Sequence, residues 1–259
     1  MAFATLVVKE GSRQLTAQIS RPENANTLNE TLIEELHQAL DWAEAMPNGR
    51  TFILEGLPGV FCTGLDFHEA VRPGNVASGR DQAAEYFRLL KRLTLSPRIV
   101  ICRVDGKAIA GGIGLVAASD IVLATARAEF SLPEALWGLL PCCVLPFLIR
   151  RLGYQKAYFL TLTTRTMTAT EAFSSHLVDE LSENLDDALR KLTLRLNLLD
   201  DRVILDLKHY FQQIAGSPPE IEQIAVQEIN RLAGQAYVRE NIANYIQHGV
   251  LPWEKRTSK

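Results

Sequence analysis

Several features that would direct a chain to a membrane, to secretion or to nucleic acid are absent from this sequence. Its 259 residues contain no apolar run of about 18 residues, so we expect no membrane-spanning helix and no membrane partner. Residues 1–8 are apolar but too few and have no basic leader, so we expect no signal peptide and a cytoplasmic location. A net charge of −3 argues against nucleic acid as a partner.

Cysteine is scarce, and its spacing follows no metal-binding pattern. The four cysteines are Cys62, Cys102, Cys142 and Cys143, and no CxxC motif occurs among them. We therefore predict no metal site, and we expect these residues to be small buried side chains in a reducing compartment.

The pattern of apolar residues changes near residue 185. Before that point, short apolar runs typical of strands alternate with amphipathic helices, which is typical of an α/β core. After it, the pattern is helical only, over residues 186–199, 202–215, 219–236 and 238–248. We therefore predict an α/β core over residues 1–185 and a C-terminal helical region over residues 186–259.

A double glycine, Gly111-Gly112, stands between a strand-like run and a helix-compatible stretch. The run covers residues 99–104 and the stretch residues 113–118. The first N–H groups of a helix have no partner inside it, so such a place can hold negative charge with backbone alone. A similar place follows residues 51–55, near Leu65. Two N–H donors from separate strand ends could form an oxyanion hole. The alternative is two tight turns that bind nothing.

Four segments, in this order, resemble the crotonase (enoyl-CoA hydratase/isomerase) superfamily from about residue 5 to the C-terminus. They are Arg21-Pro22 with residues 26–28, residues 61–66, residues 108–114 with Ser119-Asp120, and residues 130–134 with Gly138 and Pro141. The resemblance implies a core built as a crotonase-like ββα spiral and a C-terminal helical trimerisation region. It also implies a homotrimer or a dimer of trimers, and a thioester substrate carried on phosphopantetheine or CoA. No other cofactor is expected.

The catalytic residues that this resemblance implies are Leu65, Gly111 and Glu134. The amides of Leu65 and Gly111 correspond to the family's two oxyanion donors, which stabilise the enolate formed when a thioester loses its α-proton. Hydratases of the usual type carry two glutamates, but Gly114 stands at the position of one of them. Glu134 remains, and a single carboxylate could act first as base and then as acid. The alternative for Glu134 is a structural carboxylate at the start of a helix.

Substrate-binding roles are predicted for Asp66, His68 and Tyr86. The alternatives are that Asp66 only holds its loop through hydrogen bonds, and that His68 is packed or solvated. Tyr86 stands where members of the superfamily often contact the acyl chain. If the substrate has a distal carboxylate, His68, Arg72 and Arg80 are candidates to receive it.

The bulky residues 142–146, the glycine at position 114 and the ending over residues 249–254 resemble one subgroup, the dehydratases of polyketide β-branching. The resemblance implies dehydration of 3-hydroxy-3-methylglutaryl-acyl carrier protein to 3-methylglutaconyl-acyl carrier protein. An acyl carrier protein would then be the partner. The alternatives are an enoyl-CoA hydratase or isomerase that acts on a free CoA ester, and a non-catalytic scaffold of the same fold.

Overall fold

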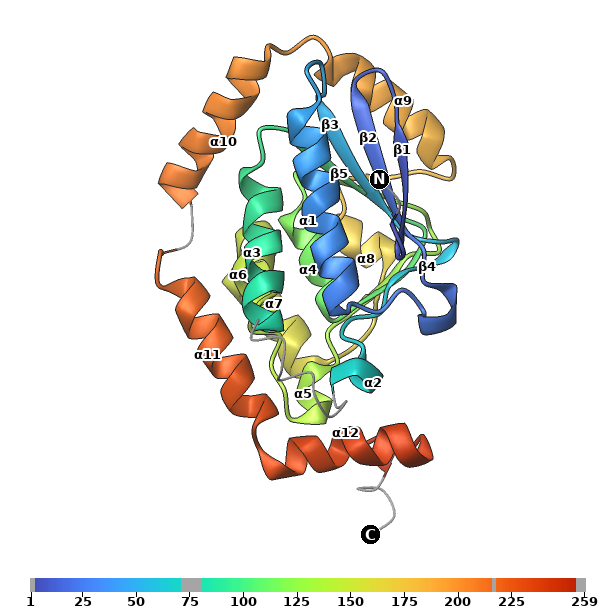
Figure 1. Ribbon diagram of the computed structural model, residues 1–259, viewed down its shortest axis with the longest axis vertical. Coiled ribbons are helices and arrows are strands. Elements are labelled where there is room, and N and C mark those ends of the chain that lie inside the picture. The colour runs from blue at the N-terminus through green and yellow to red at the C-terminus, as the bar shows by residue number, and fades with distance from the viewer. Residues whose placement is uncertain (1–2, 71–80, 216–217, 255–259) are drawn as a thin grey trace.

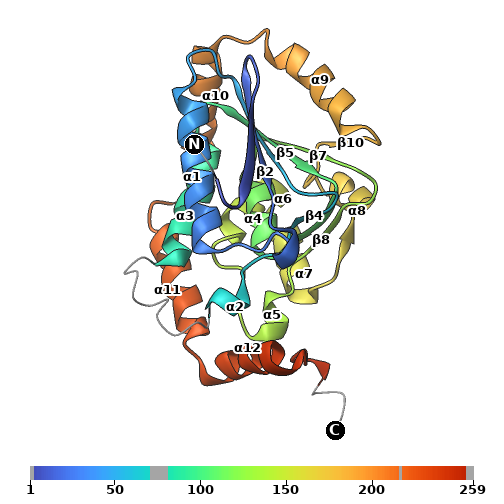
Figure 2. The same cartoon turned by 45° about the vertical axis from the view of Figure 1, so that its right-hand side comes forward.

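Two β-sheets form the centre of the computed structural model, which describes residues 3–70, 81–215 and 218–254 (Figures 1 and 2). The larger sheet has the order β1 (Leu6–Glu10), β2 (Gln14–Ile19), β3 (Thr51–Glu55), β5 (Ile99–Val104), β7 (Ile121–Ala124) and β10 (Glu180–Leu181). The smaller sheet has the order β4 (Gly59–Cys62), β6 (Gly106–Ile109), β8 (Glu129–Ser131) and β9 (Met167–Thr168). The pairs β1–β2 and β8–β9 are antiparallel, and all other neighbours are parallel.

The chain alternates between the two sheets. In each of the successive pairs β3–β4, β5–β6 and β7–β8, the first strand joins the larger sheet and the second joins the smaller one. This repeated path confirms the α/β fold with a crotonase-like spiral that the resemblance implied. The sequence pattern did not predict β6, because a four-residue strand that begins with glycine has little periodicity to recognise.

Twelve α-helices are described, together with one short 3-10 helix at Pro22–Asn24. The helices of the first part are α1 (Glu30–Ala45), α2 (Phe67–Ala70), α3 (Gln82–Leu95), α4 (Gly111–Ala118), α5 (Glu134–Trp137), α6 (Leu145–Leu152), α7 (Tyr154–Thr163) and α8 (Ala169–Ser174). Those of the last part are α9 (Leu185–Leu196), α10 (Asp201–Ala215), α11 (Ile221–Ala233) and α12 (Ala236–His248).

Two predicted helix starts are confirmed by their capping contacts. The side chain of Asn29 accepts a hydrogen bond from the N–H of Leu32 at the start of α1. At the start of α8, Thr168 and Glu171 form the predicted capping box. The sequence pattern missed α7, which is rich in tyrosine, phenylalanine and threonine, residues of modest helix propensity.

The C-terminal helices wrap around the core (Figure 1). Helix α11 packs against α3, and α12 lies beneath α2 and α5 in both views (Figures 1 and 2). Buried residues of α11 and α12, such as Leu232 and Val238, belong to the same apolar cluster as the strands. Helix α10 is anchored by an ion pair of 2.6 Å between Lys208 Nζ and Asp120 Oδ2. No described helix is both long and apolar enough to cross a membrane.

All four cysteines are buried, as predicted. Burial raises the pKa of the Cys62 thiol to about 12. Because the thiolate is the reactive form of cysteine, a raised pKa leaves the thiol unreactive. The buried cysteines therefore pack as small apolar groups.

Close contact between the backbone of α4 and the end of β4 requires glycine at position 112. A methyl group on Gly112 would lie 2.3 Å from the carbonyl oxygen of Cys62, a contact that backbone movement alone could relieve. We expect Gly112→Ala to lower the free energy of unfolding by about 3 kcal/mol, measured by urea denaturation.

The matched control is Gly234→Ala. Gly234 follows α11 at a helical φ of −71°, and a methyl group there would lie no closer than 3.3 Å to its neighbours. That variant should be as stable as the wild type or about 0.5 kcal/mol more stable. Equal stability of the two variants would show that the contact between α4 and β4 is not a tight one.

Candidate active site

Three neighbouring strands end at one edge of the smaller sheet. The strands β4, β6 and β8 are parallel, so the chain leaves each of them on the same side. Leu65 follows β4, Gly111 follows β6 and Glu134 follows β8, each within three residues of the strand end. The spiral therefore brings together the three residues predicted to be catalytic.

The Leu65 amide points away from the segment that pairs with it. Leu28 donates its N–H to the Gly64 carbonyl at 2.7 Å, and its own carbonyl accepts from the N–H of Asp66 at 2.9 Å. Because successive amides of an extended chain point to opposite sides, the Leu65 N–H faces away from Leu28. Within the described part of the chain, no group accepts a hydrogen bond from it.

The Gly111 amide opens α4 and is directed by a strained residue before it. Ala110 adopts φ 51° and ψ −120°, a conformation that costs an alanine about 1–3 kcal/mol. Its own N–H donates to the Ser131 carbonyl at 2.9 Å, which continues the pairing between β6 and β8. A methyl group on Gly64 would lie 3.4 Å from the Gly111 nitrogen, so the loops of both predicted oxyanion donors are in contact.

Glu134 is the first residue of α5, a helix of four residues that begins directly after Pro133. Its Oε2 atom is buried and has no hydrogen-bond partner among the described residues. Burial raises the pKa of Glu134 to about 8 from its ordinary value of 4.5. A buried carboxylate oxygen without a partner is unusual in a folded protein, and it fits a group that exchanges a proton with a ligand.

Tyr86 fills the space beside Gly114. Its hydroxyl donates a hydrogen bond to the Gly111 carbonyl. A methyl group on Gly114 would lie 2.2 Å from the Tyr86 Oη atom, so no larger side chain fits at this position while Tyr86 is in place. Burial raises the pKa of Tyr86, and the nearby Glu134 raises it further, so the hydroxyl keeps its proton. The space where a second carboxylate would stand thus holds a neutral phenol.

Asp66 is engaged by protein groups on both carboxylate oxygens. It forms an ion pair with Arg21 at 3.1 Å and accepts hydrogen bonds from Thr27 Oγ1 at 3.0 Å and from the N–H of His68 at 3.1 Å. These contacts connect the loop that carries Leu65 to the segment before α1. They are the contacts expected if Asp66 holds its loop through hydrogen bonds. Arg21 and Thr27 could not be predicted as these partners, because they are distant from Asp66 in the chain.

The His68 side chain is exposed on α2. The other two candidates for a distal carboxylate, Arg72 and Arg80, lie outside the described residues. No group of three or more histidine, cysteine, aspartate or glutamate side chains that could hold a metal ion occurs in the described part of the chain.

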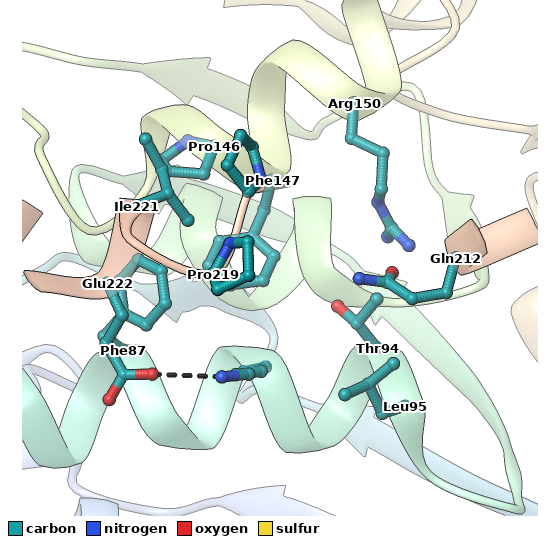
Figure 3. Close-up of a pocket in the computed structure, with 12 residues that line it drawn as sticks. Phe87, Thr94, Leu95, Pro146, Phe147, Arg150, Gln212, Pro219, Ile221 and Glu222 are labelled. Atoms are coloured by element: carbon teal, nitrogen blue, oxygen red, sulfur yellow. Dashed lines mark hydrogen bonds and ion pairs between the residues drawn. The ribbon is translucent and has the colours of Figure 1, made fainter. Parts of the chain in front are cut away.

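A pocket of about 220 Å³ lies elsewhere, between α3, α6 and the helices α10 and α11 (Figure 3). It is lined by Phe87, Lys91, Thr94, Leu95, Pro146, Phe147, Arg150, Gln212, Pro218, Pro219, Ile221 and Glu222. An ion pair of 3.2 Å between Lys91 and Glu222 crosses it. None of the predicted site residues lines this pocket.

The chain is similar to known proteins over most of its length. Residues 13–256 match the family model of enoyl-CoA hydratase/isomerase. The chain is 37% identical over 257 residues to bacillaene synthase dehydratase PksH of Bacillus subtilis (strain 168), with 98% of each chain covered. It is 29% identical over 242 residues to 1,2-epoxyphenylacetyl-CoA isomerase of Escherichia coli (strain K12), covering 83% of this chain and 91% of that relative.

Among solved structures, the fold matches that of pksH from Bacillus subtilis, named as a polyketide biosynthesis enoyl-CoA hydratase, with a TM-score of 0.89. The identity is 36%, and the match covers 97% of this chain and 100% of the other.

The raised pKa of Glu134 predicts a pH-dependent stability. The folded protein retains a proton that the unfolded chain releases, so this contribution to stability is fully present below pH 4.5 and is lost as the pH rises to about 8. Glu134→Gln keeps a neutral side chain at every pH. Between pH 4.5 and about 8 the wild type should lose stability that the variant keeps. The difference in free energy of unfolding between variant and wild type, measured in urea, should therefore grow with pH.

The control is Glu129→Gln, at an exposed position of β8. Its stability should run parallel to that of the wild type over the same pH range. If Glu134→Gln also runs parallel, Glu134 is not buried as a proton-holding group.

The contact between Tyr86 and Gly114 predicts coupled effects of substitution. We expect Gly114→Ala to lower the free energy of unfolding by about 2 kcal/mol, because the new methyl group collides with the Tyr86 hydroxyl. Tyr86→Phe removes that hydroxyl, so the double variant should recover at least about 1 kcal/mol of the summed loss. Additive losses in urea denaturation would contradict the contact.

Proposed function

Since the chain belongs to the enoyl-CoA hydratase/isomerase family, we propose that it is a hydro-lyase that removes water from a 3-hydroxyacyl thioester. One observation carries the proposal. The carboxylate of Glu134, whose Oε2 atom has no partner, lies at the same sheet edge as the amides of Leu65 and Gly111, which are unpaired within the described residues, and Tyr86 takes the place of a second acid.

The reaction needs one group that moves a proton and two groups that hold charge. The Glu134 carboxylate takes the proton from the carbon next to the thioester carbonyl, and the negative charge passes to the carbonyl oxygen. The N–H groups of Leu65 and Gly111 donate to that oxygen, each lowering the barrier by about 3 kcal/mol. The enolate then expels the hydroxyl from the third carbon, and protonated Glu134 supplies the proton that completes water. Glu134 ends as it began, as a carboxylate.

The pKa of Glu134 suits both halves of this cycle. A value of about 8 makes the carboxylate a stronger base than an ordinary glutamate, and it still ionises in part near neutral pH. A second charged carboxylate nearby would raise this pKa further and repel the enolate. The neutral hydroxyl of Tyr86 does neither.

The substrate in this proposal is 3-hydroxy-3-methylglutaryl-acyl carrier protein, and the product is 3-methylglutaconyl-acyl carrier protein in polyketide β-branching. Support comes from the 37% identity to bacillaene synthase dehydratase PksH over almost the whole chain. A cationic or hydrogen-bonding group receives the distal carboxylate of this substrate, and the candidates are the exposed His68 together with Arg72 and Arg80, which lie outside the described residues.

The protein acts as a homotrimer or a dimer of trimers in a cytoplasmic pathway. The support is a set of large apolar side chains that remain exposed on α9, on α10 and between them in the single chain. They are Leu194, Leu198, Val203, Leu207, Tyr210, Phe211 and Ile214. Apolar surface of this extent is typical of a face that packs on a second copy.

The test compares two substrates and one variant. Wild-type protein is given 3-hydroxy-3-methylglutaryl thioester on an acyl carrier protein and on free CoA, and loss of water is followed by mass spectrometry. We expect faster turnover of the carrier-bound form, and a loss of about 10³-fold in Glu134→Gln with the fold unchanged.

The outcomes separate the alternatives. Turnover of free CoA esters only would favour a hydratase or isomerase of that class. Absence of turnover on both forms, or full activity of Glu134→Gln, would refute the dehydratase mechanism.

A further inference from the structure

Four aromatic side chains from distant parts of the chain meet beside the candidate active site. Trp137 is at their centre and makes edge-to-face contacts with the other three. Its ring centroid lies 4.9 Å from that of Phe67, 5.2 Å from that of Tyr245 and 5.8 Å from that of Trp253. Such pairs each contribute about 0.5–1.5 kcal/mol beyond the area they bury. We call these four residues the aromatic cluster.

The cluster connects the predicted catalytic loops to α12 and residues 249–254, which we call the C-terminal segment. Phe67 follows the oxyanion residue Leu65 by two positions, and Trp137 ends the helical turn that Glu134 begins. Tyr245 comes from α12, and Trp253 comes from the chain beyond it. Trp253 therefore lies in residues 249–254, the ending that resembles the dehydratases of polyketide β-branching.

Hydrogen bonds from α12 hold the same turn. The hydroxyl of Tyr237 donates to the Gly138 carbonyl at 3.4 Å, and Asn241 Nδ2 donates to the Trp137 carbonyl at 3.4 Å. The segment that carries Trp253 is closed by a hydrogen bond of 2.9 Å from the Leu251 N–H to the Glu254 carboxylate. The C-terminal segment thus contacts both the backbone and the side chain at the end of α5.

Helix α5 depends on these contacts for its orientation. A helix of four residues has only one turn, and a single turn is unstable by itself. Trp137 is the residue of this helix that is buried as a whole, so packing at Trp137 decides where the turn, and with it the Glu134 carboxylate, is held. A displacement of about 1 Å between a base and its substrate can cost about 10²-fold in rate.

We infer that Trp137 and Trp253 are positioning residues, through which the C-terminal segment holds Glu134 and the Leu65 amide at their working separation. This inference rests on the proposed function for its kinetic consequences. Its structural consequence, the dry setting of Glu134, is independent of any substrate. The titratable groups that interact with Glu134 in the described residues are Tyr86 of α3 and Cys142 of the turn before α6, and both keep their protons at neutral pH.

The experiment compares Trp253→Ala with a matched control, Trp42→Ala, in the full-length protein. Trp42 is a partly buried indole on α1, and its Nε1 atom donates to Glu10 at 3.1 Å, away from the aromatic cluster. We expect Trp253→Ala to lower kcat at least 10-fold with KM changed less than threefold. Trp42→Ala should keep kcat within twofold of the wild type, and Trp253→Phe should recover most of the lost activity.

A second readout needs no turnover. The difference in unfolding free energy between each protein and its Glu134→Gln counterpart is measured across pH, which reports the proton held by Glu134. The midpoint of this pH dependence marks the loss of the proton from Glu134 in the folded protein. In Trp253→Ala the midpoint should fall at least half a pH unit below that of the wild type, because water reaches the carboxylate. In Trp42→Ala it should not move.

An unchanged midpoint in Trp253→Ala would overturn the inference, as would equal kcat in both tryptophan variants. Inactivity of the wild type on every thioester would instead count against the proposed function. The pH measurement would then still decide the positioning role.

Discussion

The parallel pairing of β4, β6 and β8 is the constraint on which the candidate site depends. Parallel neighbours deliver their carboxyl ends to one edge, so three loops that are distant in the chain start side by side. Each loop contributes one group: an amide at Leu65, an amide at Gly111 and a carboxylate at Glu134. The strain at Ala110 and the tight contact at Gly112 are local consequences of this convergence, because the backbone of α4 begins against the end of β4.

The chemistry of the site follows from what the protein leaves unsatisfied. A folded chain pairs almost all of its buried polar groups, yet one Glu134 carboxylate oxygen and the backbone amides of Leu65 and Gly111, which follow strands that end at one sheet edge, have no partner among the described residues. Two donors and one base suit a reaction that moves a proton and shifts charge to an oxygen. Tyr86 leaves no room for a second carboxylate at Gly114. Its hydroxyl fills that space, is neutral and donates a hydrogen bond to the Gly111 carbonyl. The proposed mechanism therefore uses one carboxylate twice.

The C-terminal helices do more than complete the surface. Helix α12 and the residues after it reach the turn that carries Glu134, through Tyr245 and Trp253. The turn of α5 is short, so it depends for its order on a segment about 100 residues away in the chain. Helices α9 and α10, by contrast, leave large apolar side chains exposed, and these belong to the surface assigned to the proposed assembly of several copies.

Local patterns along the chain were enough to predict most elements, since apolar periodicity and caps such as Asn29 and Thr168 act over a few residues. The order of motifs around Gly111 and Glu134 was enough to predict the superfamily, and the comparisons confirm it. The partners of Asp66, the position of Tyr86 beside Gly114 and the meeting of Trp137 with Trp253 could not be predicted. These contacts join residues that are far apart in the chain, and no local pattern records which distant side chain will fill a given space. Tertiary packing alone placed a phenol where a second carboxylate would stand and an indole behind the helical turn of Glu134.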